Sequence, residues 1–306
     1  MKIEITDLKK VIKGTIVLDD INYTFTGGRI YGLCGKNGCG KTMLMRLIAG
    51  LIYPSSGTIR IKDKVLGKDI SFPESIGMLI ENPSFLNEYT GKQNLEMLGS
   101  LQKNVDKEEV RRVLEQVGLD PDDKRKFYKY SLGMRQRLGI AMALLNTPEF
   151  LILDEPVNGL DPAGIVEIRN LLKTLNREYG MTILVSSHIL EELYQTATEF
   201  ILLDHGNIIE EISDHELNER CKRHIAIQTT DVQKAVMVLE ENLHTDHFKL
   251  MPDGTIRLYD YLDDLEMVAS VLSEAHVLVT GLFVSGDTLE DYFLSKIGGG
   301  KRWQIS

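Results

Sequence analysis

Eight consecutive residues constrain this 306-residue chain more than any other feature. They match the pattern G-x-x-x-x-G-K-[ST] at every fixed position, and they are Gly35, Lys36, Asn37, Gly38, Cys39, Gly40, Lys41 and Thr42. A strand-like run, 29–34, precedes them and a helix-like run, 43–49, follows, which is the context that a phosphate-binding loop requires. A glycine-rich turn that merely happens to precede a lysine would not need both flanks, so we interpret the segment as a P-loop.

The residue types explain how such a loop binds a nucleoside triphosphate. Glycines let backbone N–H groups point inward around the phosphates, and the N-terminus of the next helix adds a positive dipole end. We expect Lys41 to reach the β- and γ-phosphates, and Thr42 to offer its hydroxyl to Mg²⁺. The loop therefore predicts a binding site for a nucleotide and its magnesium ion.

Two carboxylates form the second element of the site. Asp154 and Glu155 directly follow the apolar run 150–153, which is typical of a buried parallel strand. Ligands of open α/β sheets bind at the carboxyl ends of such strands. We expect Asp154 to hold Mg²⁺ and Glu155 to polarise the water that attacks the γ-phosphate. Two solvated acids after a strand are common in isolation, but the complete P-loop favours the catalytic interpretation.

A second anion site is indicated by Ser131 and Gly133, which stand at the start of a strong helix-forming segment. A hydroxyl, free amides and the helix dipole together favour a phosphate at such a position. One nucleotide does not need two phosphate sites from one chain, but two chains arranged head to tail do. The sequence thus predicts a dimer in which each nucleotide lies between the P-loop of one chain and Ser131–Gly133 of the other.

Composition limits the classes of function. The net charge of −10 and the pI of about 5.3 disfavour a general polyanion-binding role, so no nucleic-acid partner is expected. The three cysteines show no paired metal-ligand spacing, and an odd number of cysteines without a secretory signal is expected of a protein in a reducing cytosol. No run approaches the roughly 20 apolar residues that span a bilayer. Any membrane role would therefore require another polypeptide to do the spanning.

The pattern of apolar residues changes along the chain. A β-rich start is followed by a helical stretch at about 85–147, and then by alternating strands and helices that indicate parallel βαβ units. Beyond this the pattern reads β-α-β-β-α-β-α, and its last helix is expected at Leu289–Ile297. We expect two domains, 1–215 and 216–306, the second a small α+β domain. Its nearby histidines, His244 and His247, lack a fourth ligand for a metal.

The order of these motifs resembles the nucleotide-binding subunit of an ATP-binding-cassette (ABC) transporter over roughly residues 2–215. The resemblance implies a P-loop cassette of the α/β class, with a parallel sheet core, an antiparallel β subdomain and a helical subdomain. It further implies ATP hydrolysis coupled to transport by a separate integral membrane permease. The chain would then be cytoplasmic and held peripherally on the inner face of the membrane by that permease.

The resemblance also assigns roles to single residues. Tyr130–Gln136 stands where the family has its Leu-Ser-Gly-Gly-Gln signature, and Ser131 and Gly133 match its phosphate-contacting members. Asp161, in the run Asn-Gly-Leu-Asp, matches the loop that joins the sites of two monomers. His188 matches the switch histidine that contacts the γ-phosphate. Because both half-sites are complete, the resemblance favours a homodimer.

Two positions depart from the family pattern. Glu81 stands where the family has a glutamine that senses Mg²⁺ and water and links the site to the membrane subunit. A carboxylate there can ligate Mg²⁺ and adds negative charge beside the γ-phosphate. The family often stacks the adenine on an aromatic residue, and here Ile12 would cover the base instead. The permease contact is expected near Glu81–Tyr89, with Phe85 and Leu86 as apolar anchors.

The Glu81 variant and the acidic α/β tail narrow the resemblance to bacterial subunits of the bacitracin-export and lantibiotic-immunity type. This implies an exporter of peptide antibiotics or similar compounds. One alternative is a non-transport ABC ATPase, such as a translation factor or a DNA-repair clamp, although the chain carries one cassette and no sustained heptads. Another is a P-loop kinase for a small molecule, which would have no use for Ser131 or for a second monomer.

Overall fold

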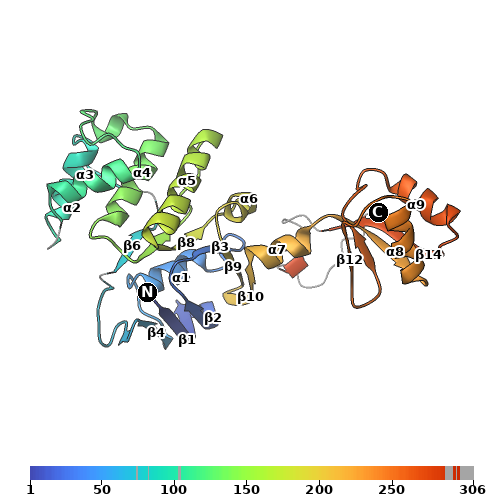
Figure 1. Ribbon diagram of the computed structural model, residues 1–306. Helices are drawn as coiled ribbons and strands as arrows, with labels where there is room; N and C mark the ends of the chain where they lie inside the picture. Colours follow the sequence, from blue (N-terminus) through green and yellow to red (C-terminus); the bar gives the residue numbers. More distant parts are fainter. Residues whose placement is uncertain (74, 82, 103–104, 287–291, 294, 297–306) are drawn as a thin grey trace. The chain divides into compact units, whose positions relative to one another are not determined.

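The computed structural model describes residues 1–306 apart from 74, 82, 103–104, 287–291, 294 and 297–306. The chain divides into two compact units, Met1–Asp214 and His215–Ser306 (Figure 1). Within the described ranges, no helix combines the length and the apolar character needed to cross a bilayer.

The centre of the first unit is a six-stranded sheet with the order β10-β9-β3-β8-β7-β6. All neighbouring strands are parallel except β10, which runs antiparallel to β9. Its strands are β3 (Ile30–Cys34), β6 (Ile76–Leu79), β7 (Phe150–Leu153), β8 (Thr182–Ser186), β9 (Glu199–Asp204) and β10 (Asn207–Ser213). Every residue of β3, β7 and β8 is buried, which explains their continuous apolar sequences. These three strands are adjacent and parallel, so their carboxyl ends meet at one edge of the sheet.

A smaller antiparallel sheet has the order β2-β1-β4-β5. Its strands are β1 (Ile3–Ile12), β2 (Thr15–Phe25), β4 (Ser56–Ile61) and β5 (Lys64–Val65). Apolar side chains alternate along these strands, and Ile3, Leu18 and Ile59 join the core that also holds Leu44 and Ile48 of helix α1 (Lys41–Ile48). Both sheets therefore share one hydrophobic core around α1.

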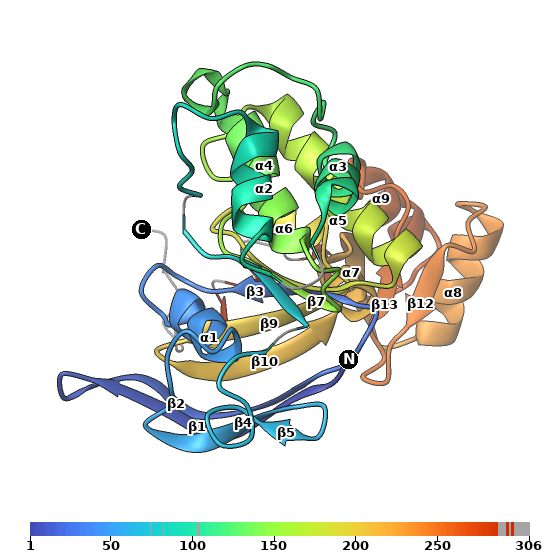
Figure 2. The same ribbon diagram turned by 90° about the vertical axis from the view of Figure 1, so that its left-hand side faces the viewer.

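Three helices gather at the side of the first unit remote from the antiparallel sheet (Figure 2). They are α2 (Gly91–Gly99), α3 (Lys107–Gln116) and α4 (Leu132–Leu144), and the short helix η1 (Phe127–Lys129) lies between α3 and α4 in the sequence. The remaining helices are α5 (Pro162–Tyr179), α6 (Leu190–Tyr194) and α7 (Asp214–Cys221). The expected fold class, a parallel sheet core with an antiparallel β part and a helical part, is confirmed.

The second unit is an antiparallel sheet of the order β12-β13-β11-β14 with two helices packed on it. In chain order the elements are β11 (His224–Thr229), α8 (Val232–Glu241), β12 (Phe248–Leu250), β13 (Ile256–Leu258), α9 (Leu265–Glu274) and β14 (Val279–Ser285). The expected α+β character is confirmed, and the β-α-β-β-α-β order matches the split βαβ arrangement. The last helix expected from the sequence, Leu289–Ile297, falls largely outside the described residues.

Candidate nucleotide-binding site

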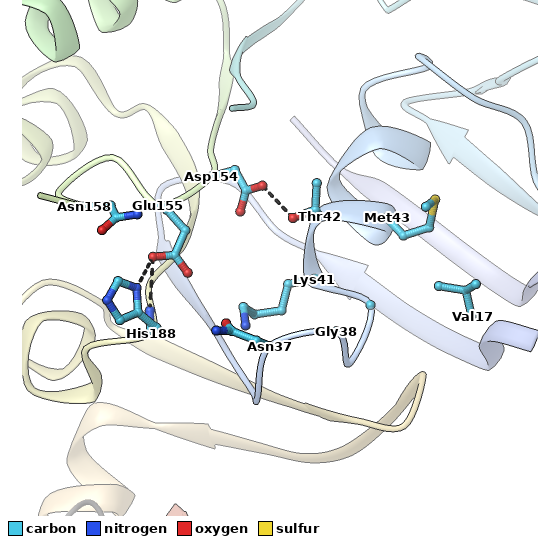
Figure 3. Close-up of a pocket in the computed structure, with 11 residues that line it drawn as sticks. Val17, Asn37, Gly38, Lys41, Thr42, Met43, Asp154, Glu155, Asn158 and His188 are labelled. Atoms are coloured by element: carbon cyan, nitrogen blue, oxygen red, sulfur yellow. Dashed lines mark hydrogen bonds and ion pairs between the residues drawn. The ribbon is translucent and has the colours of Figure 1, made fainter. Parts of the chain in front are cut away.

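A cavity of about 610 Å³ opens at the edge of the sheet where β3, β7 and β8 end (Figure 3). Half of the predicted site residues line it, and these come from segments far apart in the sequence. The lining residues are Val17, Asn37, Gly38, Gly40, Lys41, Thr42, Met43, Asp154, Glu155, Asn158 and His188.

The loop between β3 and α1 adopts a conformation that its glycines make possible. Gly35 has φ 154°, and a Cβ there would lie 2.3 Å from the Leu203 carbonyl oxygen and 2.6 Å from Cys39 Sγ. Gly35, Lys36 and Cys39 thus shape the loop, although they are not among the residues that line the cavity. Lys41 Nζ donates to the carbonyl oxygens of Gly35 at 2.6 Å and Lys36 at 3.2 Å. The lysine therefore crosses its own loop, and its amine lies where the phosphates are expected.

The hydroxyl of Thr42 donates to Asp154 Oδ2 at 2.6 Å, which joins the start of α1 to the end of β7. Two adjacent hard oxygen donors of this kind fit Mg²⁺, which binds proteins through few carboxylates and completes its shell with phosphates and water. Within the described part of the chain, no group of three or more His, Cys, Asp or Glu could hold a metal ion without further ligands. The donor set is thus suited to Mg²⁺ that arrives with a nucleotide.

Ser186, at the end of β8, contacts the Asp154 carboxylate and the backbone of Glu155. Its hydroxyl donates to Asp154 Oδ1 at 2.5 Å and accepts from the Glu155 backbone N–H at 3.0 Å. The sequence alone predicts no role for this serine, because its contacts depend on the neighbouring positions of β7 and β8. Its signal in the sequence is a polar residue directly after the apolar run 183–185.

Glu155 faces His188 across the cavity, and the imidazole Nδ1 contacts the Glu155 carboxylate (Figure 3). The Glu155 side chain is 24% exposed and that of His188 is 45% exposed, so water can reach both. Glu155 also has a positive φ of 52°, which sets the carboxylate at a sharp turn after β7. The geometry brings the carboxylate of Glu155 and the imidazole of His188 to one point of the cavity.

A second cavity of about 350 Å³ contains the other predicted phosphate contacts, Ser131 and Gly133, together with Asp161. Ser131 caps α4 by accepting from Met134 N at 3.3 Å, and Asp161 caps α5 by accepting from Gly164 N at 3.0 Å. Among the described residues, no lining residue is common to the two cavities. One chain therefore keeps its P-loop and its signature segment in separate places.

Two predicted residues lie elsewhere. Ile12 pairs with Thr15 at the end of the β1–β2 hairpin, and Val17 of β2 lines the cavity instead. Glu81 is not among the lining residues, because its carboxylate pairs with Arg46 of α1. Val17 and Met43 also line the cavity, and neither occupies a fixed position of the motifs, so they were not predicted. Asn158, which begins the run Asn-Gly-Leu-Asp, lines the cavity as well.

The thiols of Cys34 and Cys39, beside the loop, have low reactivity. Burial raises the pKa of the Cys34 thiol to about 12, and burial also raises the pKa of Cys39. Both thiols are therefore protonated at neutral pH and serve as packing residues rather than nucleophiles.

Comparison with known proteins connects this geometry to a family. Residues 18–158 match the family described as ABC transporter. The chain is 40% identical over 299 residues to the bacitracin transport ATP-binding protein BcrA of Enterococcus faecalis, covering 97% of each protein. It is 38% identical over 208 residues to the lantibiotic transport ATP-binding protein SrtF of Streptococcus pyogenes, covering 68% of this chain and 89% of that protein.

A solved structure is also similar. The structure of cbiO1 from Clostridium perfringens, described as part of the ABC transporter complex cbiONQ, matches with a TM-score of 0.63 and 28% identity. The match covers 71% of this chain and 90% of that one.

Proposed function

The chain belongs to the ATP-binding proteins of the ABC transporter family, and we propose that it hydrolyses ATP to energise a separate membrane permease that exports a peptide antibiotic. One observation carries this proposal: Thr42, Asp154, Glu155 and His188 line one cavity beside the P-loop. The peptide-antibiotic substrate rests on the relatives, whose names refer to bacitracin and lantibiotic transport.

The residues of the cavity divide the chemistry among them. Backbone N–H groups of Gly38 and Gly40 and the Lys41 amine bind the phosphates. Thr42 and Asp154 would hold Mg²⁺, and the ion would supply positive charge to neutralise the transferred phosphoryl group. Glu155 accepts a proton from the attacking water, and His188 orients that carboxylate and the γ-phosphate.

The separation of the two cavities supports a head-to-tail dimer. Ser131 and Gly133 would meet the nucleotide on the P-loop of a second copy, and Asp161 would lie beside the same junction. ATP would then close the dimer, and hydrolysis would release it. The motion would drive the permease, with this chain held at the inner face of the membrane.

The permease contact is proposed for the segment after β6. Phe85 packs edge-on against Phe127 with ring centroids 5.2 Å apart, so it supports the segment from inside. The side chains of Leu86 and Tyr89 are 52% and 42% exposed, and they offer apolar surface to a partner. A Leu86→Asp variant should lose its membrane partner in a tagged pull-down from detergent extracts while keeping its ATP affinity.

The test of the ATPase itself is Glu155→Gln. The variant should bind ATP as the wild type does, hydrolyse it at least about a hundredfold more slowly, and accumulate as a dimer in size-exclusion chromatography. Glu178→Gln, in an exposed ion pair on α5, is the matched control and should behave as the wild type. A Glu155→Gln protein that stays monomeric with ATP would favour a P-loop kinase instead.

A further inference from the structure

Arg46 and Glu81 form an ion pair that the site described above leaves unexplained. Arg46 lies on α1, which begins at the nucleotide cavity, and Glu81 follows β6, so the pair joins these two segments. The Arg46 side chain is 34% exposed and the Glu81 side chain is 66% exposed. The pair therefore remains accessible to an incoming ion.

The position of Arg46 on its helix places the pair close to the expected metal. Arg46 comes four residues after Thr42 on α1, and residues spaced in this way are neighbours on one helix face. The hydroxyl of Thr42 already reaches Asp154 at 2.6 Å. Arg46 consequently stands one helical turn beyond the proposed Mg²⁺ donors.

The position of Glu81 after β6 also places it near the proposed Mg²⁺ donors. Leu79 of β6 pairs with Leu153 of β7, and Asp154 N donates to the Leu79 carbonyl oxygen at 2.8 Å. Glu81, two residues after Leu79, thus emerges beside Asp154 and Glu155. Its positive φ of 70° shows that the chain turns sharply there.

The charges at this edge set up a competition. Glu81, Asp154 and Glu155 are three carboxylates at the ends of two adjacent strands. Lys41 donates to backbone carbonyls, whereas Arg46 pairs directly with one of the carboxylates. A divalent cation bound at Thr42 and Asp154 would attract the same carboxylate that Arg46 holds.

We propose that Arg46 is a positioning residue: its ion pair holds the Glu81 carboxylate away from the Mg²⁺ site until Mg²⁺, arriving with a nucleotide, takes the place of Arg46. The inference rests on the proposed ATPase function and adds a residue to it. Glu81 exchanges the Arg46 guanidinium for Mg²⁺. The ion therefore gains its contact with Glu81 only after the ion pair with Arg46 has opened. Arg46 thereby sets the Mg²⁺ concentration at which the nucleotide site becomes complete.

The test measures binding in place of turnover. A fluorescent, non-hydrolysable ATP analogue is bound to the full-length chain while Mg²⁺ is titrated from zero. Arg46→Gln should lower the half-maximal Mg²⁺ concentration about two- to fivefold, the range typical of an exposed ion pair. Arg46→Lys keeps the charge but loses the planar fork, and it should give a smaller shift in the same direction.

A double-mutant cycle identifies the partner. In a Glu81→Gln background, Arg46→Gln should leave the Mg²⁺ midpoint unchanged. Arg111→Gln on α3, which breaks an exposed pair with Asp122, is the matched control and should have no effect in either background. A shift that persists without Glu81, or a wild-type midpoint in Arg46→Gln, would overturn the inference while the ATPase proposal stands. A wild-type chain that does not bind the analogue with Mg²⁺ would overturn both.

Discussion

At the scale of single residues, the site depends on a serine that joins the Asp154 carboxylate to the backbone N–H of Glu155. Ser186 is fully buried and bonds to both Asp154 and Glu155. Ser186→Ala leaves a carboxylate oxygen and a backbone N–H without this partner, so we expect it to lower the free energy of unfolding by about 1–3 kcal/mol. Hydrolysis should fall about tenfold or more, because the Asp154 carboxylate and the backbone that carries Glu155 both lose the contact that orients them.

The neighbouring serine provides the control. Ser187 is also buried, but its hydroxyl accepts from Ile189 N at 3.0 Å and does not touch either carboxylate. Chemical denaturation should show a loss of stability for Ser187→Ala as well, whereas steady-state hydrolysis should fall less. Equal loss of activity in the two variants would remove the special role of Ser186.

Alkaline pH should weaken the fold through Cys34. The unfolded thiol has a pKa near 9, and burial raises the folded pKa to about 12. Between these values the unfolded chain releases its proton first, so stability is complete below pH 9 and is lost as the pH rises towards 12, at up to about 1.4 kcal/mol per pH unit. The pKa of Tyr23 is also raised by burial and adds to the effect. Urea unfolding of Cys34→Ala from pH 8 to 11 should show a flatter decline, and parallel curves would contradict this.

Residue-level prediction from the sequence succeeded where chemistry is local. Gly38, Lys41 and Thr42 were expected in one loop because a contiguous motif specifies that loop. Ser186 and Arg46 were not, since each acts on a partner that is distant in the sequence. Neither contact can be derived without the register between β7 and β8 or the direction in which Glu81 leaves β6.

At the scale of elements, two helices begin at residues with a structural and a proposed functional role. Ser131 caps α4 and Asp161 caps α5. Loss of a cap costs about 1 kcal/mol, so Ser131→Ala and Asp161→Ala should each lower stability by about that much. If these side chains also complete the site of a second copy, hydrolysis should fall well beyond tenfold. Thermal unfolding beside ATPase rates separates the roles, and a purely structural cap would leave activity nearly intact.

The element pattern itself was predictable in large part. The strand-like run 29–34 and the apolar run 150–153 correspond to β3 and β7, and the β-rich start corresponds to β1 and β2. The antiparallel addition of β10 could not be derived, because a strand's direction depends on the turn that precedes it and on its neighbour. The short β5 has two residues and no periodicity to detect.

At the scale of the whole molecule, the two units have separate hydrophobic cores. Leu239 of α8 is fully buried in the core of the second unit. We expect Leu239→Ala to destabilise that unit by about 2–5 kcal/mol and to leave ATP affinity unchanged. Chemical denaturation should show two transitions, with only the transition of the second unit shifted, and binding of the ATP analogue should be unchanged. A loss of ATP-analogue affinity in Leu239→Ala would show that the two units depend on each other.

The relatives match this chain over different lengths. The match to BcrA extends over 299 residues and therefore includes both units, whereas the match to SrtF extends over 208 residues, close to the length of Met1–Asp214 alone. We therefore propose the second unit as an accessory domain, and we expect the chemistry to reside in the first.

The position of β6 at the edge of the six-stranded sheet affects how proteins of this fold can adapt to different permeases. Strands β3, β7 and β8 are held on both sides, so the phosphate loop and the catalytic carboxylates sit on a stiff foundation. Among the described strands of this sheet, β6 pairs with β7 alone. Glu81 and the segment proposed to meet the permease follow β6 in the chain. Substitutions near this edge strand can adapt the ATPase to a different permease without disturbing the nucleotide site at the centre of the sheet.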